Sequence, residues 1–324
     1  MPSSNVNWPL PLTRQNPWFP GQMGVPGTDT ETGLRLHSTG CVFYVDPNYP
    51  GASDLRDGTN PEDPLLTVQA AINKCQPYRG DVVAVMCNNA WQYHNNADGY
   101  LTPIAEEVVI SVPGVRLVGV NPSGSNGVPW LATDDNQTLI HIKALDVCVE
   151  GFLFYDDNNA GIRGIFAEWG VLAFGDNPTI RNNTFHGLAI GVQLEYCWYA
   201  HIHDNIFHDG KGIYVDPALS GAAYNDIHDN QFDYCAFAMS CQGMDYSFIH
   251  GNSLSDWRAI TGAAATDAGI DLTNGNRNQV YDNYLSCLLP AAAPGDYNDY
   301  NTAGATDAWI GNHCMDGLAV TRPT

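Results

Sequence analysis

The sequence predicts an all-β protein, a single parallel β-helix in which short strands coil around one core. A six-residue pattern, with an Asn between an aliphatic and an apolar residue, occurs six times between residues 178 and 315. Successive copies are 22, 25, 22, 31 and 29 residues apart, counted at Asn183, Asn205, Asn230, Asn252, Asn283 and Asn312. A period in the twenties that tolerates insertions indicates coils that stack on one another.

Each copy has the alternation of a strand. We expect Ile202 to point inward, His203 outward and Phe207 inward again after a polar turn. A period of two leaves no room for a helix. A second short strand lies between the copies, at Gly164–Phe166, Gly191–Leu194, Gly212–Val215, Ala236–Met239 and Gly269–Leu272. We therefore expect two or three strands in each coil.

The repeated asparagines are expected to lie inside the coil at a sharp corner. There, the side-chain amides of successive coils would bond to one another, as in the ladders of stacked sheets. Asn also tolerates the left-handed backbone that a tight corner needs. In the alternative interpretation they are exposed turn residues of an ordinary sandwich.

The N-terminal part of the β-helix is predicted from strand-like runs at Val82–Met86, Val108–Ile110, Val115–Val120, Thr138–Ile142 and Val147–Phe154. Upstream, the pattern predicts a helix over Pro64–Cys75, with Val68, Ala71 and Ile72 on one face. The first coil must be covered, because an open end would expose apolar surface and an unpaired edge. Residues 41–80 are thus expected to hold the first strand and a capping helix, and residues 81–324 the β-helix.

Residues 1–40 differ in kind from the rest. They are rich in Pro and aromatic residues and have no period, so they are expected to form an extended arm. Trp8, Trp18 and Phe19 are apolar anchors of the kind that docks on another surface. We expect the arm to dock on a neighbouring subunit or a capsid lattice; the alternative is an arm that lies along its own β-helix.

Three segments carry a resemblance to a known superfamily, at Cys41–Asp46, Asp57–Ile72 and Gly80–Val83. They resemble the opening of right-handed parallel β-helix proteins of the pectate-lyase-like type, and they are also similar to small β-helix proteins encoded among bacteriophage structural genes. The resemblance implies a single-stranded right-handed parallel β-helix. It leaves the activity open, because that superfamily includes lyases, glycoside hydrolases, epimerases, tailspikes and non-enzymatic virion proteins.

Composition limits the partners. With 13 basic and 35 acidic residues the net charge is −22, so the basic footprint of a nucleic-acid-binding protein is missing. An anionic polymer would be repelled unless a cation or an Arg cluster mediated binding. No apolar run is long enough to span a membrane, and the start of the chain has no secretory signal. Nine scattered cysteines fit a reduced protein, with Cys148, Cys197, Cys235 and Cys287 as small buried residues.

Histidines recur at outward positions of the repeat. His201, His203, Asp226 and His228 stand at strand spacing and could bind a divalent metal within one chain or around a trimer axis. The alternative is a polar surface position copied from coil to coil, or an imidazole-lined trimer interface that weakens on protonation. The sequence assigns no metal and no cofactor.

The sequence contains recurring and solitary aspartates, and a glycosidase needs two such acids about 5–9.5 Å apart. Asp204, Asp229 and Asp282 recur just before the repeated Asn, so they are expected to shape turns. Asp156 and Asp157 form a solitary pair. No catalytic motif is evident, and no catalytic residue is assigned.

The function predicted from the sequence is that of a non-enzymatic virion structural protein. We expect a homotrimeric capsid decoration or attachment protein of a bacteriophage, made in the host cytoplasm and bound to a capsid or tail protein through residues 1–40. The alternative is a carbohydrate-active β-helix: a tailspike depolymerase, a polysaccharide lyase or hydrolase, or a glycan-binding adhesin. In that case outward aromatics would stack on sugars, with Tyr196, Trp198, Tyr199 and Tyr214 as candidates.

Overall fold

The computed structural model describes residues 40–86, 103–120, 127–156, 160–168, 177–216, 221–235, 237–255, 269–286, 297–298 and 306–314. Within these residues the chain has one helix, α2 (Val68–Lys74), and strands that form three sheets. None of the described residues belongs to a helix with the length and hydropathy that a membrane crossing requires. The predicted docking residues Trp8, Trp18 and Phe19 lie outside the described residues.

The strands form three sheets, and within each sheet neighbouring strands follow one another in sequence order. Sheet 1 contains β1 (Val42–Val45), β2 (Val82–Met86), β4 (Arg116–Val120), β7 (Cys148–Glu150), β10 (Thr179–Arg181), β13 (His201–His203), β16 (Asp226–His228), β19 (Phe248–His250), β22 (Gln279–Tyr281) and β25 (Ala308–Ile310). Sheet 2 contains β5 (Val128–Leu131), β8 (Phe152–Tyr155), β11 (Thr184–His186), β14 (Ile206–His208), β17 (Gln231–Asp233), β20 (Ser253–Ser255), β23 (Tyr284–Ser286) and β26 (His313–Cys314). Sheet 3 contains β3 (Val108–Ile110), β6 (Thr138–Ile142), β9 (Arg163–Glu168), β12 (Ile190–Glu195), β15 (Lys211–Val215), β18 (Phe237–Cys241), β21 (Ile270–Asp271) and β24 (Tyr297–Asn298).

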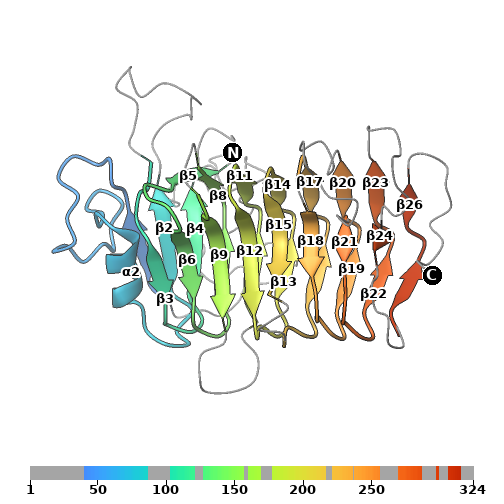
Figure 1. Cartoon of the computed structure of the whole chain (residues 1–324). Helices are drawn as coiled ribbons and strands as arrows, with labels where there is room; N and C mark the ends of the chain where they lie inside the picture. Colours follow the sequence, from blue (N-terminus) through green and yellow to red (C-terminus); the bar gives the residue numbers. More distant parts are fainter. Residues whose placement is uncertain are drawn as a thin grey trace, which may run out of the picture.

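From β4 onward the chain visits sheets 1, 2 and 3 in turn and then begins the next coil. Neighbouring strands in a sheet therefore come from successive coils, and they pair in parallel. The result is a right-handed parallel β-helix, as the sequence predicts, with coils side by side along one axis (Figure 1).

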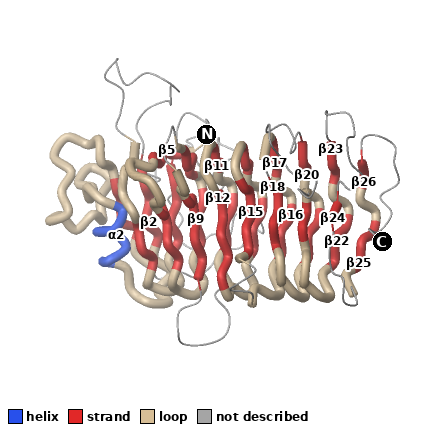
Figure 2. The backbone as a smooth tube through the Cα atoms, viewed as in Figure 1, coloured by secondary structure: helices blue, strands red, loops and turns tan. Residues whose placement is uncertain are grey.

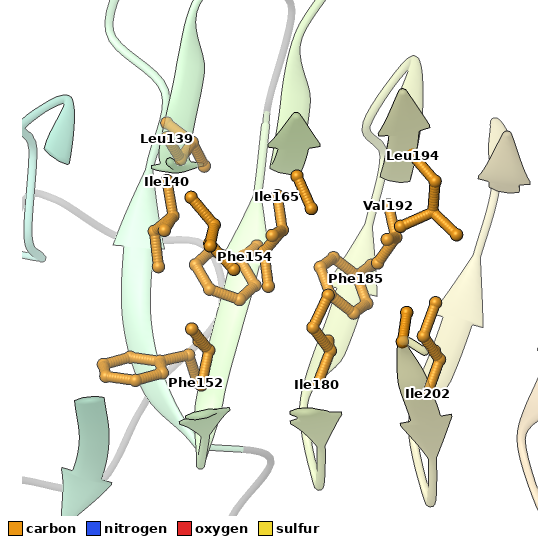
Figure 3. Close-up of a cluster of buried hydrophobic side chains, with 14 of the residues drawn as sticks. Leu139, Ile140, Phe152, Phe154, Ile165, Ile180, Phe185, Val192, Leu194 and Ile202 are labelled. Atoms are coloured by element: carbon orange, nitrogen blue, oxygen red, sulfur yellow. The ribbon is translucent and has the colours of Figure 1, made fainter. Parts of the chain in front are cut away.

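The core is filled by like side chains stacked from coil to coil. The rings of Phe154, Phe185, Phe207 and Phe232 form one row, with successive centroids 5.1, 4.8 and 4.8 Å apart. A second row holds aliphatic residues of sheet 1, among them Ile180 and Ile202. Figure 3 shows these rows meeting inside the coil. Burial of such rows on every coil supplies the main stabilising term.

The repeated asparagines form a continuous buried ladder. The backbone N–H of Asn183 donates to Oδ1 of Asn205 at 3.0 Å, and that of Asn205 to Oδ1 of Asn230 at 3.1 Å. The same bond joins Asn230 to Asn252, Asn252 to Asn283 and Asn283 to Asn312, at 3.0 Å each. The side-chain amide of each Asn up to Asn283 also donates to the next Oδ1. From Asn183 to Asn283 these are buried corner residues, and Asn312 at the last coil is half-buried; none is an exposed turn residue.

A second polar ladder lies at another corner, where the sequence predicts none. The backbone N–H of Ala200 donates to Asn225 Oδ1, that of Asn225 to Ser247 Oγ, and that of Ser247 to Asn278 Oδ1. The N–H of Asn278 donates to Asp307 Oδ1 at 2.7 Å. Because Asn, Ser and Asp share this one position, the residue type does not repeat although its acceptor role does.

The residue that directly precedes an Asn of the first ladder has a left-handed backbone in four of the coils. Asn182, Asp204, Asp229 and Asp282 have φ between 53° and 56°. Asp and Asn tolerate this region better than most residues. The expectation that the three recurring aspartates shape turns is therefore confirmed.

Helix α2 covers the end of the β-helix, beside β1, β2 and β3 (Figure 2). It is shorter than predicted: it begins at Val68, not at Pro64. Thr67 is its N-cap and accepts a hydrogen bond from the N–H of Ala70, while Leu65 is already paired with Val45 in a parallel bridge. The strand-like pairing of Leu65 excludes a helix that begins at Pro64, four residues before Val68.

Two further boundaries differ from the prediction. The run Val147–Phe154 is split into β7 and β8, which belong to different sheets, because Gly151 turns the chain with φ 82°. Strand β5 was not predicted from the sequence. It brings Trp130 into the core against Phe152.

Candidate functional site

The outer face of sheet 3 gathers an unusual set of side chains. Parallel register places His141, Phe166, Gln193, Tyr214, Ser240 and Asp271 in one row. Arg163 and Lys211 lie on one side of this row, and Glu168 and Glu195 lie on the other. We call the row and these four residues together the sheet-3 face. Although the row points away from the core, Phe166 and Gln193 are only 7% and 6% exposed. These two outward-facing side chains are therefore largely buried.

Gln193 lies between Phe166 and Tyr214 in the row. Its Oε1 is buried, and it has no hydrogen-bond partner within the described part of the chain. An unsatisfied buried carbonyl costs about 1–3 kcal/mol. Because this oxygen has almost no accessible surface, a bound molecule would reach it only after neighbouring side chains move.

Two cations lie over the aromatic rings of this face. The Nζ of Lys211 is 4.5 Å from the ring centre of Tyr214, and the guanidinium carbon of Arg163 is 5.5 Å from that of Phe166. Neither cation is in an ion pair with a described residue. In a chain of net charge −22 that has three lysines, they bring positive charge to this face.

Carboxylates line the opposite side of the row. Glu168 Oε1 accepts a bond from Lys143 Nζ at 2.7 Å and lies 3.1 Å from His141 Nε2. The imidazole of His141 stacks on Phe166 with ring centres 4.7 Å apart. Glu195 is the neighbour of Glu168 on the adjacent strand. Polar groups of both signs thus flank the aromatic row.

Burial sets the ionisation of several groups on this face. It raises the pKa of Glu195 above the usual 4.5, and the negative charges of Glu168 and Asp216 raise it further. Burial lowers the pKa of His141 below 6.5 and raises the pKa of Tyr214 above 10.0. At neutral pH, His141 and Tyr214 are therefore neutral groups that can exchange hydrogen bonds with hydroxyls.

A second cluster lies on the outer face of sheet 2. His186 and His208 are partners on β11 and β14, and their rings stack with centres 4.9 Å apart. The Oδ2 of Asp209 is 2.8 Å from His208 Nδ1 and 3.7 Å from His186 Nε2. Among the described residues, this is the group in which three ligand atoms of the kind that binds metals lie within 4.8 Å of one another.

Residues 125–317, more than half of the chain, match the family described as periplasmic copper-binding protein (NosD). The chain belongs to the NosD family. All residues of both clusters fall within the matched range. No curated protein matches the sequence significantly.

Solved structures similar to this NosD-family chain share its fold at low sequence identity. Pectate lyase Pel9A is 14% identical, with a TM-score of 0.44 over 85% of this chain and 70% of the lyase. An alginate lyase from Paenibacillus is 15% identical, with a TM-score of 0.47 over 76% and 92%. The enzymatically active domain of bacteriophage CBA120 tailspike protein 2 is 12% identical, with a TM-score of 0.41 over 91% and 45%. The predicted fold, a parallel β-helix, is confirmed by the three parallel sheets of the chain.

The NosD-family chain places its sheet 1 histidines differently from the predicted metal group. The rings of His203, His228 and His250 stack within 5° of parallel, at 4.8 and 5.0 Å. His203 and His228 each direct Nδ1 to the aspartate that follows in sequence, at 2.8 and 2.9 Å. His201 is exposed in the neighbouring row, and Asp226 Oδ1 lies 3.1 Å from His250 Nε2. The four predicted residues therefore do not converge on one point.

The aromatics predicted to stack on sugars do not share one face either. Tyr214 lies on the sheet-3 face, whereas Trp198 and Tyr199 lie at the corner that leads into sheet 1. There Tyr199, Tyr224 and Tyr246 form a half-exposed stack, with ring centres 5.2 and 5.1 Å apart. Sequence reasoning missed the other residues of the sheet-3 face. The available signal was that Lys211, one of three lysines in the chain, falls in a strand between two of the Asn repeats.

Proposed function

We propose that this NosD-family protein is a carbohydrate-active β-helix that binds a glycan along the sheet-3 face. The observation that carries the proposal is the row of Phe166, Gln193 and Tyr214 on the outer face of sheet 3, with Arg163 and Lys211 over its two aromatic rings. Sugars present apolar C–H faces and many hydroxyls. An aromatic row interrupted by a hydrogen-bond acceptor is complementary to both.

The charges on the face favour an anionic glycan. Arg163 and Lys211 lie on the same side of the row, and each contacts an aromatic ring while its positive charge has no described carboxylate partner. They supply the local cations without which the overall charge of −22 would repel such a polymer. Binding requires only these contacts and no cleavage step.

The test is affinity for polysaccharides with and without carboxylate groups, such as alginate, pectate and neutral dextran. We expect the wild-type protein to prefer an anionic polymer. Tyr214→Ala and Lys211→Ala should each weaken that binding about tenfold, which corresponds to roughly 1.4 kcal/mol. Tyr224→Ala, which removes an aromatic ring from the corner stack, is the matched control and should bind normally.

Equal affinity of Tyr214→Ala and the wild-type protein for every polymer would overturn the proposal. So would a loss of binding in Tyr224→Ala alone. New chain ends appearing during incubation with the polymer would show cleavage, and the function would then be enzymatic.

The virion role remains a second proposal, supported by the composition of residues 1–40. In it the protein is a non-enzymatic homotrimer that decorates a bacteriophage capsid or tail, and Trp8, Trp18 and Phe19 are its docking residues. Deletion of residues 1–40 should abolish attachment to particles while the far-ultraviolet circular dichroism of the β-helix is kept. Retained attachment, or a solution mass of one 35.2 kDa chain, would contradict it.

The family description names copper, and the donor set of this chain can be compared with that metal. Imidazole nitrogens suit copper and zinc, and a carboxylate can complete the set. His186, His208 and Asp209 provide these ligands among the described residues. The group therefore fits such an ion.

A further inference from the structure

The outer face of sheet 2 carries a group of side chains that the proposed glycan binding does not use. His186 and His208 follow the inward residues Phe185 and Phe207 on neighbouring strands, so parallel register brings the two imidazoles together. Asp209 comes next and has a left-handed backbone, with φ 66°. This conformation returns its carboxylate to the two rings, where Oδ2 reaches both.

We propose that His186, His208 and Asp209 form a binding site for one divalent transition-metal ion of the zinc and copper type. This site is separate from the sheet-3 face and does not depend on glycan binding, but it rests on the fit to the family's metal described above. Two imidazole nitrogens and one carboxylate oxygen are three of the four ligands of a tetrahedral ion, and water can supply the fourth. Calcium and magnesium prefer sites made of oxygen ligands.

The distances are close to those of a bound ion. Metal–ligand bonds of about 2.0–2.2 Å place neighbouring ligand atoms of a tetrahedral site roughly 3.3–3.5 Å apart. Asp209 Oδ2 lies 3.7 Å from His186 Nε2 and 2.8 Å from His208 Nδ1. All three ligand atoms lie within 4.8 Å of one another, and the side chains, with 31%, 35% and 41% exposure, have to rotate to bring the two imidazole nitrogens to bonding distance of one ion.

A second carboxylate lies close to His208. The Oδ2 of Asp233, on the next strand of sheet 2, lies 3.8 Å from His208 Nε2. Its Oδ1 accepts a hydrogen bond from Ser255 Oγ at 3.1 Å, which holds the carboxylate in place. A carboxylate opposite the ligating nitrogen is the usual support of a metal-binding histidine. At 3.8 Å the two atoms are not hydrogen-bonded in this structure, so Asp233 would act as a positioning residue only once the ring of His208 turns toward it and presents Nδ1 to the ion.

The histidines of sheet 1 form a natural comparison. His228 also has an aspartate next to it in sequence and also stacks on a neighbouring imidazole. Its ring is within 4° of parallel with that of His203, whereas the rings of His186 and His208 are tilted by 27°. Ring nitrogens bind in the plane of the ring, so in either stacked pair a ring must rotate before both imidazoles can reach one ion. The sheet 1 pair is a matched control because it shares the stacking but, among the described residues, does not belong to a group of three ligand atoms within 4.8 Å of one another.

The experiment is calorimetric titration of the full-length chain, stripped with a chelator and dialysed, with Zn²⁺, Cu²⁺ and Ca²⁺. We expect one site for Zn²⁺ and Cu²⁺ that does not bind Ca²⁺. His186→Ala, His208→Ala and Asp209→Asn should each weaken binding more than tenfold, and Asp233→Asn about tenfold. His228→Ala and Asp229→Asn should bind as the wild-type protein does. Circular dichroism and the melting temperature of each metal-free variant check that it folds.

Three results would overturn the site. If His186→Ala and His208→Ala bind both ions like the wild-type protein, the ion binds elsewhere, and a metal function stands without this site. If the wild-type chain binds neither ion, both the site and the fit to the family's metal fall. If His228→Ala alone abolishes binding, the ligands lie on sheet 1. Nitrogen couplings in the electron paramagnetic resonance spectrum of bound Cu²⁺ count the imidazoles directly, and two are expected.

Discussion

Asn205 and Asn230 are 25 residues apart in sequence and are joined by two hydrogen bonds to one atom. The backbone N–H and the side-chain amide of Asn205 donate to Oδ1 of Asn230 at 3.1 and 3.0 Å. The amide of Asn230 in turn donates to the backbone carbonyl of Ile202. One side chain thereby fixes the register of consecutive coils and satisfies the backbone at their corner.

Asn230→Ala is therefore expected to destabilise the protein. It leaves the N–H of Asn205 and the carbonyl of Ile202 buried without these partners, at about 1–3 kcal/mol for each unsatisfied group. Urea unfolding followed by circular dichroism measures the loss. Asn276→Ala is the control, because Asn276 is exposed and its side chain is not part of a ladder. Equal stability of the two variants would show that the ladder contributes little.

The phenylalanine row predicts a large effect of a single ring. Phe207 is buried and stacks on Phe185 and Phe232 at 4.8 Å. Phe207→Ala should lower the free energy of unfolding by about 3–5 kcal/mol, because it removes apolar contacts and leaves a cavity. Phe248→Ala, at an outward position of sheet 1 that is 40% exposed, should cost far less. Similar losses in both variants would contradict the assigned core.

The capping helix depends on Thr67. Its hydroxyl accepts a bond from the N–H of Ala70 and donates to Asp54. Thr67→Ala should lower stability by about 1 kcal/mol, and Thr67→Ser should restore most of it. Thermal unfolding of the three proteins at one pH checks this, and a Ser variant as unstable as the Ala variant would argue against the cap.

Removal of the negative charge of Glu195 is expected to stabilise the folded protein, by an amount that depends on pH. Burial first, and then the charges of Glu168 and Asp216, raise its pKa in the folded state. A carboxyl whose folded pKa is raised binds its proton more tightly when folded, so its ionisation at higher pH reduces stability. Glu195→Gln should therefore melt at a higher temperature than the wild-type protein at pH 7, with a smaller difference at pH 4. A variant that is less stable at pH 7 would reverse the sign and refute the assignment.

Asp204 acts in the opposite direction. The hydrogen bond from His203 holds the pKa of Asp204 below its usual 3.8. The stabilisation is present above the unfolded pKa and is lost as the pH falls through the lower folded value. Asp204→Asn should thus be less stable than the wild-type protein at pH 6, and the two should approach each other below about pH 3. A difference that does not change between these pH values would contradict the linkage.

Much of the architecture could be predicted because the coils repeat. The asparagines of the first ladder are identical in six copies, so their shared position was visible in the sequence. The second ladder uses Asn225, Ser247, Asn278 and Asp307 for one role. A hydrogen-bond acceptor is all that this corner requires, and several residue types supply it. Its period was therefore hidden.

The candidate sites depend on geometry that no spacing reveals. His186 and His208 occur one coil apart, which was available as a signal, but the part of Asp209 follows from its left-handed backbone. The sheet 1 histidines have an equally regular spacing and also stack. Among the described residues, only the sheet 2 group brings three ligand atoms within 4.8 Å of one another, and the position of Asp209 at its corner decides this.

By itself the sequence determined the coil, its period, its buried asparagines and the parallel β-helix fold. These follow from local patterns, because each coil repeats the same inward and outward positions. The tertiary structure alone decided which outward residues become neighbours, on which sheet, and which of them are buried. Residues 20 to 30 positions apart meet only through the register of the strands, so the contacts of Gln193 and of Asp209 arise when the coils stack.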